Sequence, residues 1–461
     1  DIDRLGEGTV IRGSDIDASA ARERTRQRRL LRLAIVLGCG LVYVWGRLLS
    51  GDPISFGMPP IVQENPEIVL SVGLMVMLAA LILLPFLGAG RSPHTVLRPE
   101  DTGIRLADVV GAEHTKREAI DTLNLFLAHR TFHDEMGGTS RRGVLFEGAP
   151  GTGKTYLAKA MAGEAGVPFL FVSASEFQSM YYGQTNRKIR TYFKQLRKLA
   201  IAEGGAIGFI EEFDAIGMSR SGMNTGSMRE GITGVVNELL VQMQSFDVPV
   251  GPVRFLGKLV DFANKWLPAD RRLRRPQMPP ANVLVIAATN RAADLDRALV
   301  RPGRFDRLVH FGLPARTDRE AIAAYYLDQK AHGDDVDAAG IGEITSGYSP
   351  VQIERLLDEA LIFALRSGRR AMNRTDVLDA KLVTELGLAQ KVGYAPLEQR
   401  RIAVHEAGHA LVAELLGRKV EVASILRRSD SLGLVAHGDG ADDERHLQTP
   451  SDARRLIQVA F

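Results

Sequence analysis

A glycine-rich segment at residues 142–165 constrains the fold of this chain more than any other feature. Its sequence, RGVLFEGAPGTGKTYLAKAMAGEA, predicts a short apolar strand, a loop and a helix, and the loop fits the pattern GxxxxGK(S/T). In such a loop, backbone N–H groups turn toward phosphates, the lysine reaches the β- and γ-phosphates, and the final hydroxyl binds Mg²⁺. We therefore expect a P-loop in a parallel α/β sheet, with ATP and Mg²⁺ as cofactors. The residues expected at the nucleotide are Gly148, Pro150, Gly151, Thr152, Gly153, Lys154, Thr155 and Tyr156.

Two further apolar segments are predicted to be strands that end in polar residues beside this loop. The segment AIGFIEEFDAIG, 206–217, contains Glu211 and Glu212 where ATPases of this type usually carry Asp-Glu. Glu212 is expected to polarise the attacking water, and Glu211, one methylene longer than aspartate, to stand at the Mg²⁺ position. The segment NVLVIAATN, 282–290, ends in Asn290, which is placed to sense the γ-phosphate.

Two apolar segments before the P-loop are predicted to cross a membrane. Residues 33–46 carry no charge and lie between two arginines, so residues 30–49 are long enough for a bilayer of ~30 Å. A buried core helix or a signal peptide would be the alternative, but no cleavage site or secreted domain is evident. Residues 67–90 form the second predicted membrane helix, because residues 68–90 contain no charge.

Basic residues predict the orientation of these two helices. Arginines are frequent in the arm 1–29 and occur in the linker 91–103, whereas the connecting loop 50–66 contains neither arginine nor lysine. We therefore expect a two-pass protein of a bacterial-type inner (plasma) membrane, with a short external loop and with both termini cytoplasmic. The lipid bilayer is thus an expected partner.

Composition excludes other classes of partner and site. The net charge of +3 is too small to argue for nucleic acid, and no basic stripe with interleaved aromatic residues occurs. The single cysteine, Cys39, excludes an internal disulfide and a zinc module of the CxxC type. We expect no nucleic-acid partner.

The segment AVHEAGHALVAELL, 403–416, contains a zinc-protease pattern. On a helix, His405 and His409 share one face, and Glu406 lies beside the first of them. The two imidazoles are expected to bind Zn²⁺, and the Glu406 carboxylate is expected to activate water as the catalytic base. A catalytic zinc needs a third protein ligand, which this pattern does not contain.

Together these motifs resemble the FtsH-type family of membrane-anchored AAA+ ATP-dependent zinc metalloproteases. The resemblance runs from about residue 104 to the end of the sequence. The segment LADVVGAEHTK, 106–116, is similar to the family's adenine-contacting opening, and it carries Val110 and Gly111. The segment VRPGRFDR, 300–307, is similar to its inter-subunit motif.

The resemblance implies a homo-hexameric ring that threads unfolded polypeptide. Arg301 and Arg304 would act as arginine fingers on the ATP of the neighbouring subunit. In SMYYGQTNRKIR, 179–190, Tyr181 takes the place of the pore aromatic that grips the substrate, although a tyrosine packed on a neighbour is the alternative.

The resemblance also implies a domain plan. An AAA+ parallel sheet with a helical lid would follow two transmembrane helices and precede the start of an α-helical zincin-type protease domain. The expected ranges are 104–315 for the large ATPase subdomain, 316–389 for the lid and 390–461 for the N-terminal part of the metallopeptidase domain. In the lid, Pro350 and Val351 stand where the family favours Gly-Ala, so the nucleotide contact there stays open. The insertion at about 248–280 is expected either to pack on its own domain or to dock to a membrane or a partner.

The third zinc ligand and the function remain open. In the family this ligand is an aspartate on a later helix, expected beyond Phe461, with Asp442, Asp443 and Glu444 as alternatives that look like a solvated loop. One function is an ATP-driven protease that unfolds, threads and degrades membrane and cytosolic proteins. The other is a non-proteolytic AAA+ remodelling or chaperone ATPase with a vestigial protease domain.

Overall fold

The structure is a computed structural model, and it describes most of the chain from residue 18 onward. The described ranges are 18–51, 94–129, 131–138, 142–178, 184–217, 226–244, 281–387, 394–426, 434–438 and 449–460, with isolated positions within 67–78 and 260–273. The chain forms two compact units. The first contains residues 1–109, 113–148 and 154–311, and the second contains residues 110–112, 149–153 and 312–461.

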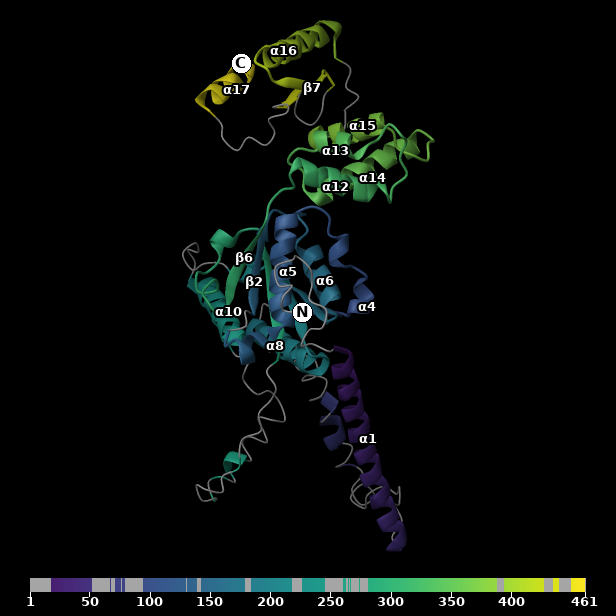
Figure 1. The fold of residues 1–461 in the computed structure, drawn as a ribbon, viewed down its shortest axis with the longest axis vertical. Coiled ribbons are helices and arrows are strands. Elements are labelled where there is room, and N and C mark those ends of the chain that lie inside the picture. Colours follow the sequence, from purple (N-terminus) through teal and green to yellow (C-terminus); the bar gives the residue numbers. More distant parts are fainter. Residues whose placement is uncertain are drawn as a thin grey trace. The chain divides into compact units, whose positions relative to one another are not determined.

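The first unit is built on a six-stranded sheet with the order β1-β3-β4-β5-β2-β6 (Figure 1). All neighbouring strands from β3 to β6 pair in parallel, and only the short edge strand β1 pairs antiparallel, with β3. The parallel α/β fold expected from the P-loop is therefore confirmed. The strands are β1 Thr95–Leu97, β2 Gly143–Gly148, β3 Phe169–Ser173, β4 Ala206–Glu211, β5 Val283–Thr289 and β6 Phe305–Phe311.

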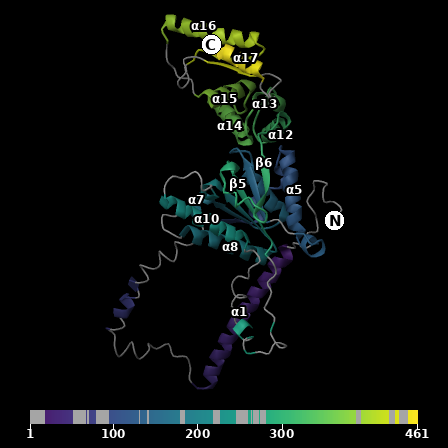
Figure 2. The ribbon, with the colours of Figure 1, turned by 90° about the vertical axis from the view of Figure 1, so that its left-hand side faces the viewer.

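Helices cover both faces of this sheet, because successive strand side chains point to opposite faces. In β2, Val144 and Phe146 belong to the core beneath α5 (Glu113–Leu127) and α6 (Lys154–Ala165). Leu145 belongs to the core beneath α8 (Gln184–Glu203) and α10 (Gly226–Gln244). Figure 2 shows α8 and α10 on one side of the sheet and α5 on the other. Strands buried on both faces explain the continuous apolar runs in the sequence.

Four helices form a lid with its own core in the second unit. They are α12 Arg316–Leu327, α13 Ala338–Ile344, α14 Pro350–Arg366 and α15 Arg374–Leu386. Ile353, Leu356 and Leu357 of α14 are completely buried in this core. A capping box of Ser349 and Gln352 starts α14, and proline at its first turn suits a position where no N–H partner is needed. The expected helical lid is thus confirmed.

The remainder of the second unit contains α16 Pro396–Leu415, the antiparallel pair β7 Lys419–Ser424 and β8 Leu434–Gly438, and α17 Pro450–Ala460. The predicted helix at the zinc-protease pattern is α16.

The N-terminal helix α1 extends over Ala18–Leu49 and contains the first predicted membrane segment, 30–49. Its apolar side chains, such as Val36 and Leu41, are mostly exposed. Among the described helices, none combines the length and apolar character needed to traverse a bilayer. Most of the second predicted segment, 67–90, falls outside the described ranges.

Candidate functional site

The P-loop follows β2 and leads directly into α6. Gly151 has φ of 78° and Gly153 has φ of 94°, both in the left-handed region that favours glycine. This conformation explains why the loop carries glycine at these two positions. The half-buried Tyr156 follows on the first turn of α6.

Lys154 joins the start of α6 to the end of strand β5. Its Nζ donates hydrogen bonds to the carbonyl oxygen of Gly148 at 2.8 Å and to Oδ1 of Asn290 at 2.9 Å. Burial lowers the pKa of Lys154, and the charges of Glu211 and Asp214 oppose this shift. The ammonium group is thus held by acceptors around the loop, as a phosphate-binding lysine requires.

Thr155 and Glu211 form a direct pair at the same site. The Thr155 hydroxyl donates a hydrogen bond to Oε1 of Glu211 at 2.6 Å. Glu211 is the last residue of β4, and Thr155 lies in the first turn of α6. A hydroxyl and a carboxylate are oxygen ligands of the kind that suits Mg²⁺, so the donor set fits the expected ion.

Glu212 follows in a left-handed conformation with φ of 52°, which is uncommon for a residue with a side chain. The next residue fixes this turn, because the Phe213 N–H donates to the carbonyl oxygen of Ala288 on β5 at 2.8 Å. The Ser173 hydroxyl, at the end of β3, donates to Oε2 of Glu212 at 3.3 Å. The turn therefore directs the Glu212 carboxylate along the edge of the sheet at which β3, β4 and β5 end.

Asp214 is a site residue that sequence reasoning missed. Oδ1 of Asp214 accepts a hydrogen bond from the Thr289 hydroxyl at 3.1 Å, and the same hydroxyl accepts from the Arg291 N–H at 3.0 Å. These contacts tie the turn after β4 to the end of β5. The available signal was an acid three residues after Glu211, beside a strand that ends in Thr-Asn.

Arg301 and Arg304 lie before β6, away from the hydrogen bonds described above. Arg301 is exposed, and Arg304 donates through Nη1 to the carbonyl oxygen of Ala298. Within the described part of the chain, neither arginine forms a hydrogen bond or ion pair with the acidic residues of the site.

In the second unit, the P-loop backbone contacts the start of α14. The Val351 N–H points to the carbonyl oxygen of Gly151 at 3.5 Å. A Cβ at Gly151 would lie 3.0 Å from Oγ of Ser349 and 3.2 Å from Cβ of Val351, so this approach also requires glycine. The Thr152 hydroxyl donates a hydrogen bond to the carbonyl oxygen of Ala149 at 2.8 Å, which closes the loop. Pro150, between these two residues, is exposed.

Of the segment expected to contact adenine, 106–116, only residues 110–112 belong to the second unit. Val110 packs against the lid core, and Gly111 has φ of 74°. A Cβ at Gly111 would lie 3.2 Å from Cδ1 of Ile322 on α12. Both residues are therefore fixed by lid contacts.

On α16, the side chains of His405 and His409 converge. Their Nε2 atoms are 3.1 Å apart, and two nitrogen ligands of a tetrahedral zinc with bonds of ~2.0–2.1 Å lie about 3.3 Å apart. Nδ1 of His409 lies 2.6 Å from the carbonyl oxygen of Val459 on α17. That carbonyl accepts the Nδ1 proton, so the Nε2 lone pair of His409 accepts a hydrogen bond from His405 here and could bind a metal in its place. The two histidines fit a zinc site, with the half-buried Glu406 beside them.

Several predicted site residues lie outside the described ranges. These are Tyr181, the three acids Asp442, Asp443 and Glu444, and most of the insertion at 248–280. Among the residues that are described, no group of three or more metal-binding side chains occurs.

Comparison with known proteins agrees with this geometry. Residues 144–313 match the family described as "ATPase family associated with various cellular activities (AAA)". The chain is similar to an ATP-dependent zinc metalloprotease FtsH from Cupriavidus metallidurans, with 36% identity over 75% of this chain and 48% of the relative. It is also similar to the protein of that name from Acidothermus cellulolyticus, with 35% identity over 81% of this chain and 51% of the relative. The chain therefore spans about half the length of these relatives.

Proposed function

This chain is an FtsH-family AAA ATPase, and we propose that it is a membrane-anchored, ATP-dependent zinc metalloprotease. In this proposal it unfolds, threads and degrades membrane and cytosolic proteins. The observation that carries the proposal is the convergence of the His405 and His409 Nε2 atoms, 3.1 Å apart, in a chain that also has a P-loop ATPase site.

For ATP hydrolysis, the residues act by binding and orientation. Lys154 would pair with the terminal phosphates, Thr155 and Glu211 would hold Mg²⁺, and Glu212 would orient the attacking water. Arg301 and Arg304 would complete the site of a neighbouring subunit in a homo-hexamer. The exposure of Arg301 suits this role.

For peptide hydrolysis, Zn²⁺ bound at α16 would supply Lewis-acid chemistry. His405 and His409 would bind it through Nε2, and Glu406 would accept the proton of the attacking water. The carbonyl of Val459 would keep the proton of His409 on Nδ1. A third protein ligand is needed to complete the site.

Anchorage in a bacterial-type inner membrane is supported by the FtsH-type resemblance and by the exposed apolar segment of α1, although α1 as described does not meet the criteria for a membrane-spanning helix. Residues 33–46 carry no charge, and their apolar side chains are exposed along the helix. A continuous apolar surface of this kind is unfavourable in water and would be covered by lipid. Single cysteines at 15 and 95, in a chain without Cys39, should resist an impermeant label in intact cells, while one at 57 reacts. Labelling at 95 from outside would disprove the two-pass topology.

The second candidate is a non-proteolytic remodelling ATPase. The described residues provide two zinc ligands and no group of three. An ATPase with a vestigial protease domain would retain the P-loop geometry and need no third ligand.

The deciding experiment uses the complete protein in proteoliposomes with a folded membrane-protein substrate. We expect ATP-dependent cleavage that is lost in both Glu212→Gln and Glu406→Gln, while Glu406→Gln still hydrolyses ATP. Unfolding of the substrate without cleavage by the unmodified protein would favour the remodelling ATPase.

A further inference from the structure

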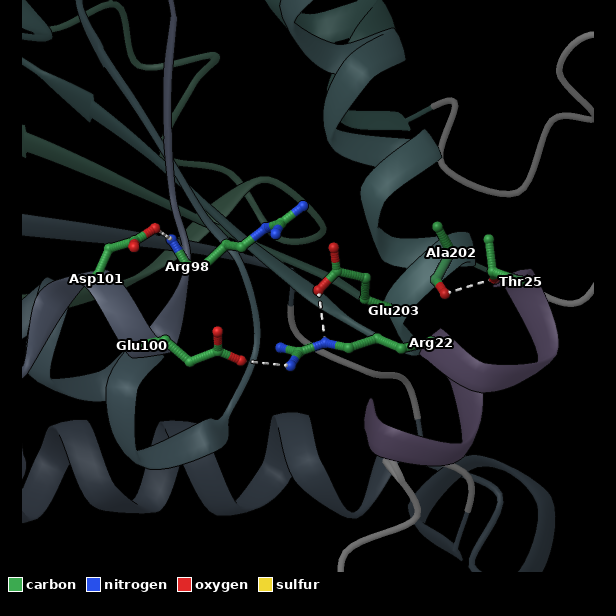
Figure 3. A network of polar contacts seen from close by, with 7 residues as sticks. All are labelled: Arg22, Thr25, Arg98, Glu100, Asp101, Ala202 and Glu203. Carbon is green, nitrogen blue, oxygen red and sulfur yellow. Dashed lines mark hydrogen bonds and ion pairs between the residues drawn. The ribbon is translucent and has the colours of Figure 1, made fainter. Parts of the chain in front are cut away.

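The N-terminal end of α1 is held on the ATPase unit by polar contacts (Figure 3). Nε of Arg22 donates to Oε2 of Glu203 at 3.1 Å, and Nη1 donates to Oε1 of Glu100 at 3.2 Å. The Thr25 hydroxyl donates to the carbonyl oxygen of Ala202 at 2.8 Å. Arg22 and Thr25 are three residues apart, so they share one face of α1.

The chemistry of the α8 end explains why a cation and a hydroxyl dock there. Ala202 and Glu203 are the last two residues of α8, where carbonyl groups have no partner within the helix and the helix dipole is negative. Thr25 satisfies one of these carbonyls. Arg22 pairs with the Glu203 side chain, which is only 13% exposed and therefore needs a partner more than a surface carboxylate does. Glu100, on the short helix α4 (Pro99–Thr102), adds a second, exposed ion pair.

Helix α8, which contacts the start of α1, packs directly against the sheet. Tyr192, Phe193 and Leu196 of α8 are completely buried against the sheet. The Tyr192 hydroxyl also donates to the carbonyl oxygen of Leu170 on β3 at 3.0 Å. A contact to the end of α8 is therefore a contact to the ATPase core and not to a surface loop.

The apolar segment 33–46 continues on the same uninterrupted helix of 32 residues. At 1.5 Å per residue, Leu33 lies only ~16 Å along the axis from Arg22. Fixing the first turns of α1 on α8 thus also fixes the direction of the apolar segment relative to the sheet.

We propose that Arg22 clamps α1 to the ATPase unit, so that the apolar segment and the sheet move as one body during the ATP-driven extraction of membrane proteins. The docking surface is formed by α4 and the end of α8, and its occupant is residues 18–27 of the same chain. This proposal rests on the membrane anchorage proposed above.

The clamp is tested by electron–electron distance measurements on the complete protein in liposomes. Cys39→Ser provides the background, and spin labels are attached at Gln27→Cys and Lys198→Cys, both exposed positions on α1 and α8. We expect a narrow distance distribution that persists when labelled protein is diluted with unlabelled protein. Loss of the narrow component on dilution would place the docked α1 on a neighbouring subunit and overturn the clamp within one chain.

Charge reversal provides the matched comparison. Arg22→Glu should lower the docked fraction roughly fivefold or more, because two attractions become repulsions. Arg26→Glu makes the same charge change at an exposed position of α1 and should leave the distribution narrow. Arg22→Glu combined with Glu203→Arg should restore most of the docked fraction. Equal distributions for Arg22→Glu and Arg26→Glu would overturn the proposal.

Function is measured on the same variants. Arg22→Glu should leave basal ATP hydrolysis within about twofold and lower the extraction of a membrane substrate more than the processing of a soluble one. An equal loss of activity on the membrane substrate and on the soluble substrate would overturn the proposal that Arg22 couples the apolar segment to the ATPase unit. Flotation with liposomes measures membrane anchorage separately. Protein that does not float contradicts the proposed function. Protein that floats, but in which Arg22→Glu leaves the spin-label distance distribution unchanged, contradicts only the clamp.

Discussion

The hydroxyl of Thr155 and the carboxylate of Glu211 are joined by a hydrogen bond of 2.6 Å, which connects the first turn of α6 to the end of β4. Both groups would face Mg²⁺ when nucleotide binds. The glutamate, one methylene longer than the usual aspartate, contacts the hydroxyl directly. A metal ion that enters this position has to break this hydrogen bond or bind the two oxygen atoms together.

Glu211→Asp should therefore use Mg²⁺ better than the unmodified protein. The shorter side chain leaves more room for the ion and its water, so half-maximal ATP hydrolysis is expected at a lower Mg²⁺ concentration. The measurement is steady-state ATPase activity as a function of Mg²⁺ at saturating ATP. Glu211→Gln is the control, since loss of the charge should raise the Mg²⁺ requirement. Identical curves for all three proteins would show that Glu211 does not contact the metal.

Glu212→Gln should bind ATP normally and hydrolyse it at least ~10²-fold more slowly, because an amide cannot polarise the attacking water as a carboxylate does. Binding of a fluorescent nucleotide and single-turnover hydrolysis measure the two effects separately. Lys154→Ala is the contrasting variant, and it should lose nucleotide binding. Turnover by Glu212→Gln at the unmodified rate would mean that Glu212 is not the catalytic carboxylate.

The sequence predicted the parts of this site that depend on local pattern. Strands β4 and β5 could be recognised because both of their faces are buried, and the P-loop by its glycines. The contacts of Asp214 with Thr289 and of Ser173 with Glu212 depend on which strands are neighbours in the sheet. The order of the strands in the sheet could not be predicted from the spacing of the motifs in the sequence.

Helix α1 shows a similar limit. The first predicted helix began at residue 30, where apolar residues start, whereas α1 begins at Ala18. The basic arm contains alanine, arginine and glutamate, which favour helix. Its contacts with α8, through Arg22 and Thr25, stabilise the added turns, and no local pattern predicted these contacts.

In the lid, Asp376→Asn should destabilise α15 at neutral pH. Both oxygens of Asp376 accept hydrogen bonds from Arg369, at 2.5 and 2.6 Å, and Oδ2 also accepts from the N–H of Asn373. The hydrogen bonds from Arg369 hold the pKa of Asp376 below its usual value. We expect the free energy of unfolding of the lid to fall by about 1 kcal/mol, because Arg369 is partly exposed and solvent screens the pair.

The same pair predicts a pH dependence. Because the pKa of Asp376 is lower in the folded lid than in the unfolded chain, its stabilisation is fully present above the unfolded pKa of ~3.9. It disappears as the pH falls through the lower folded value. Amide hydrogen exchange in α14 and α15 should therefore differ between Asp376→Asn and the unmodified protein at pH 7 and converge in acid. A difference that is independent of pH would indicate a packing effect instead.

Zinc binding should depend on His405 and His409 far more than on their surroundings. The Nε2 atoms are 3.1 Å apart, and the carbonyl of Val459 accepts the Nδ1 proton of His409, so the His409 imidazole already presents an unprotonated Nε2 toward His405. Loss of an orienting partner usually costs 10–100-fold in affinity, and loss of a ligand should cost more than that. We expect His405→Ala or His409→Ala to abolish stoichiometric zinc in the complete protein.

Glu406→Gln separates metal binding from chemistry, because the amide cannot accept a proton but leaves both imidazoles in place. This variant should keep its zinc, measured by elemental analysis, and lose peptide cleavage. Conversion of Asp442, Asp443 and Glu444 to amides is the control and should change neither quantity, since a zincin-type site with its third ligand on a later helix does not use them. Loss of zinc in that triple variant would instead assign the third ligand to this acidic segment. Retention of zinc after both histidines are removed would show that α16 does not hold the metal, and the remodelling ATPase would then be the better account of the protein.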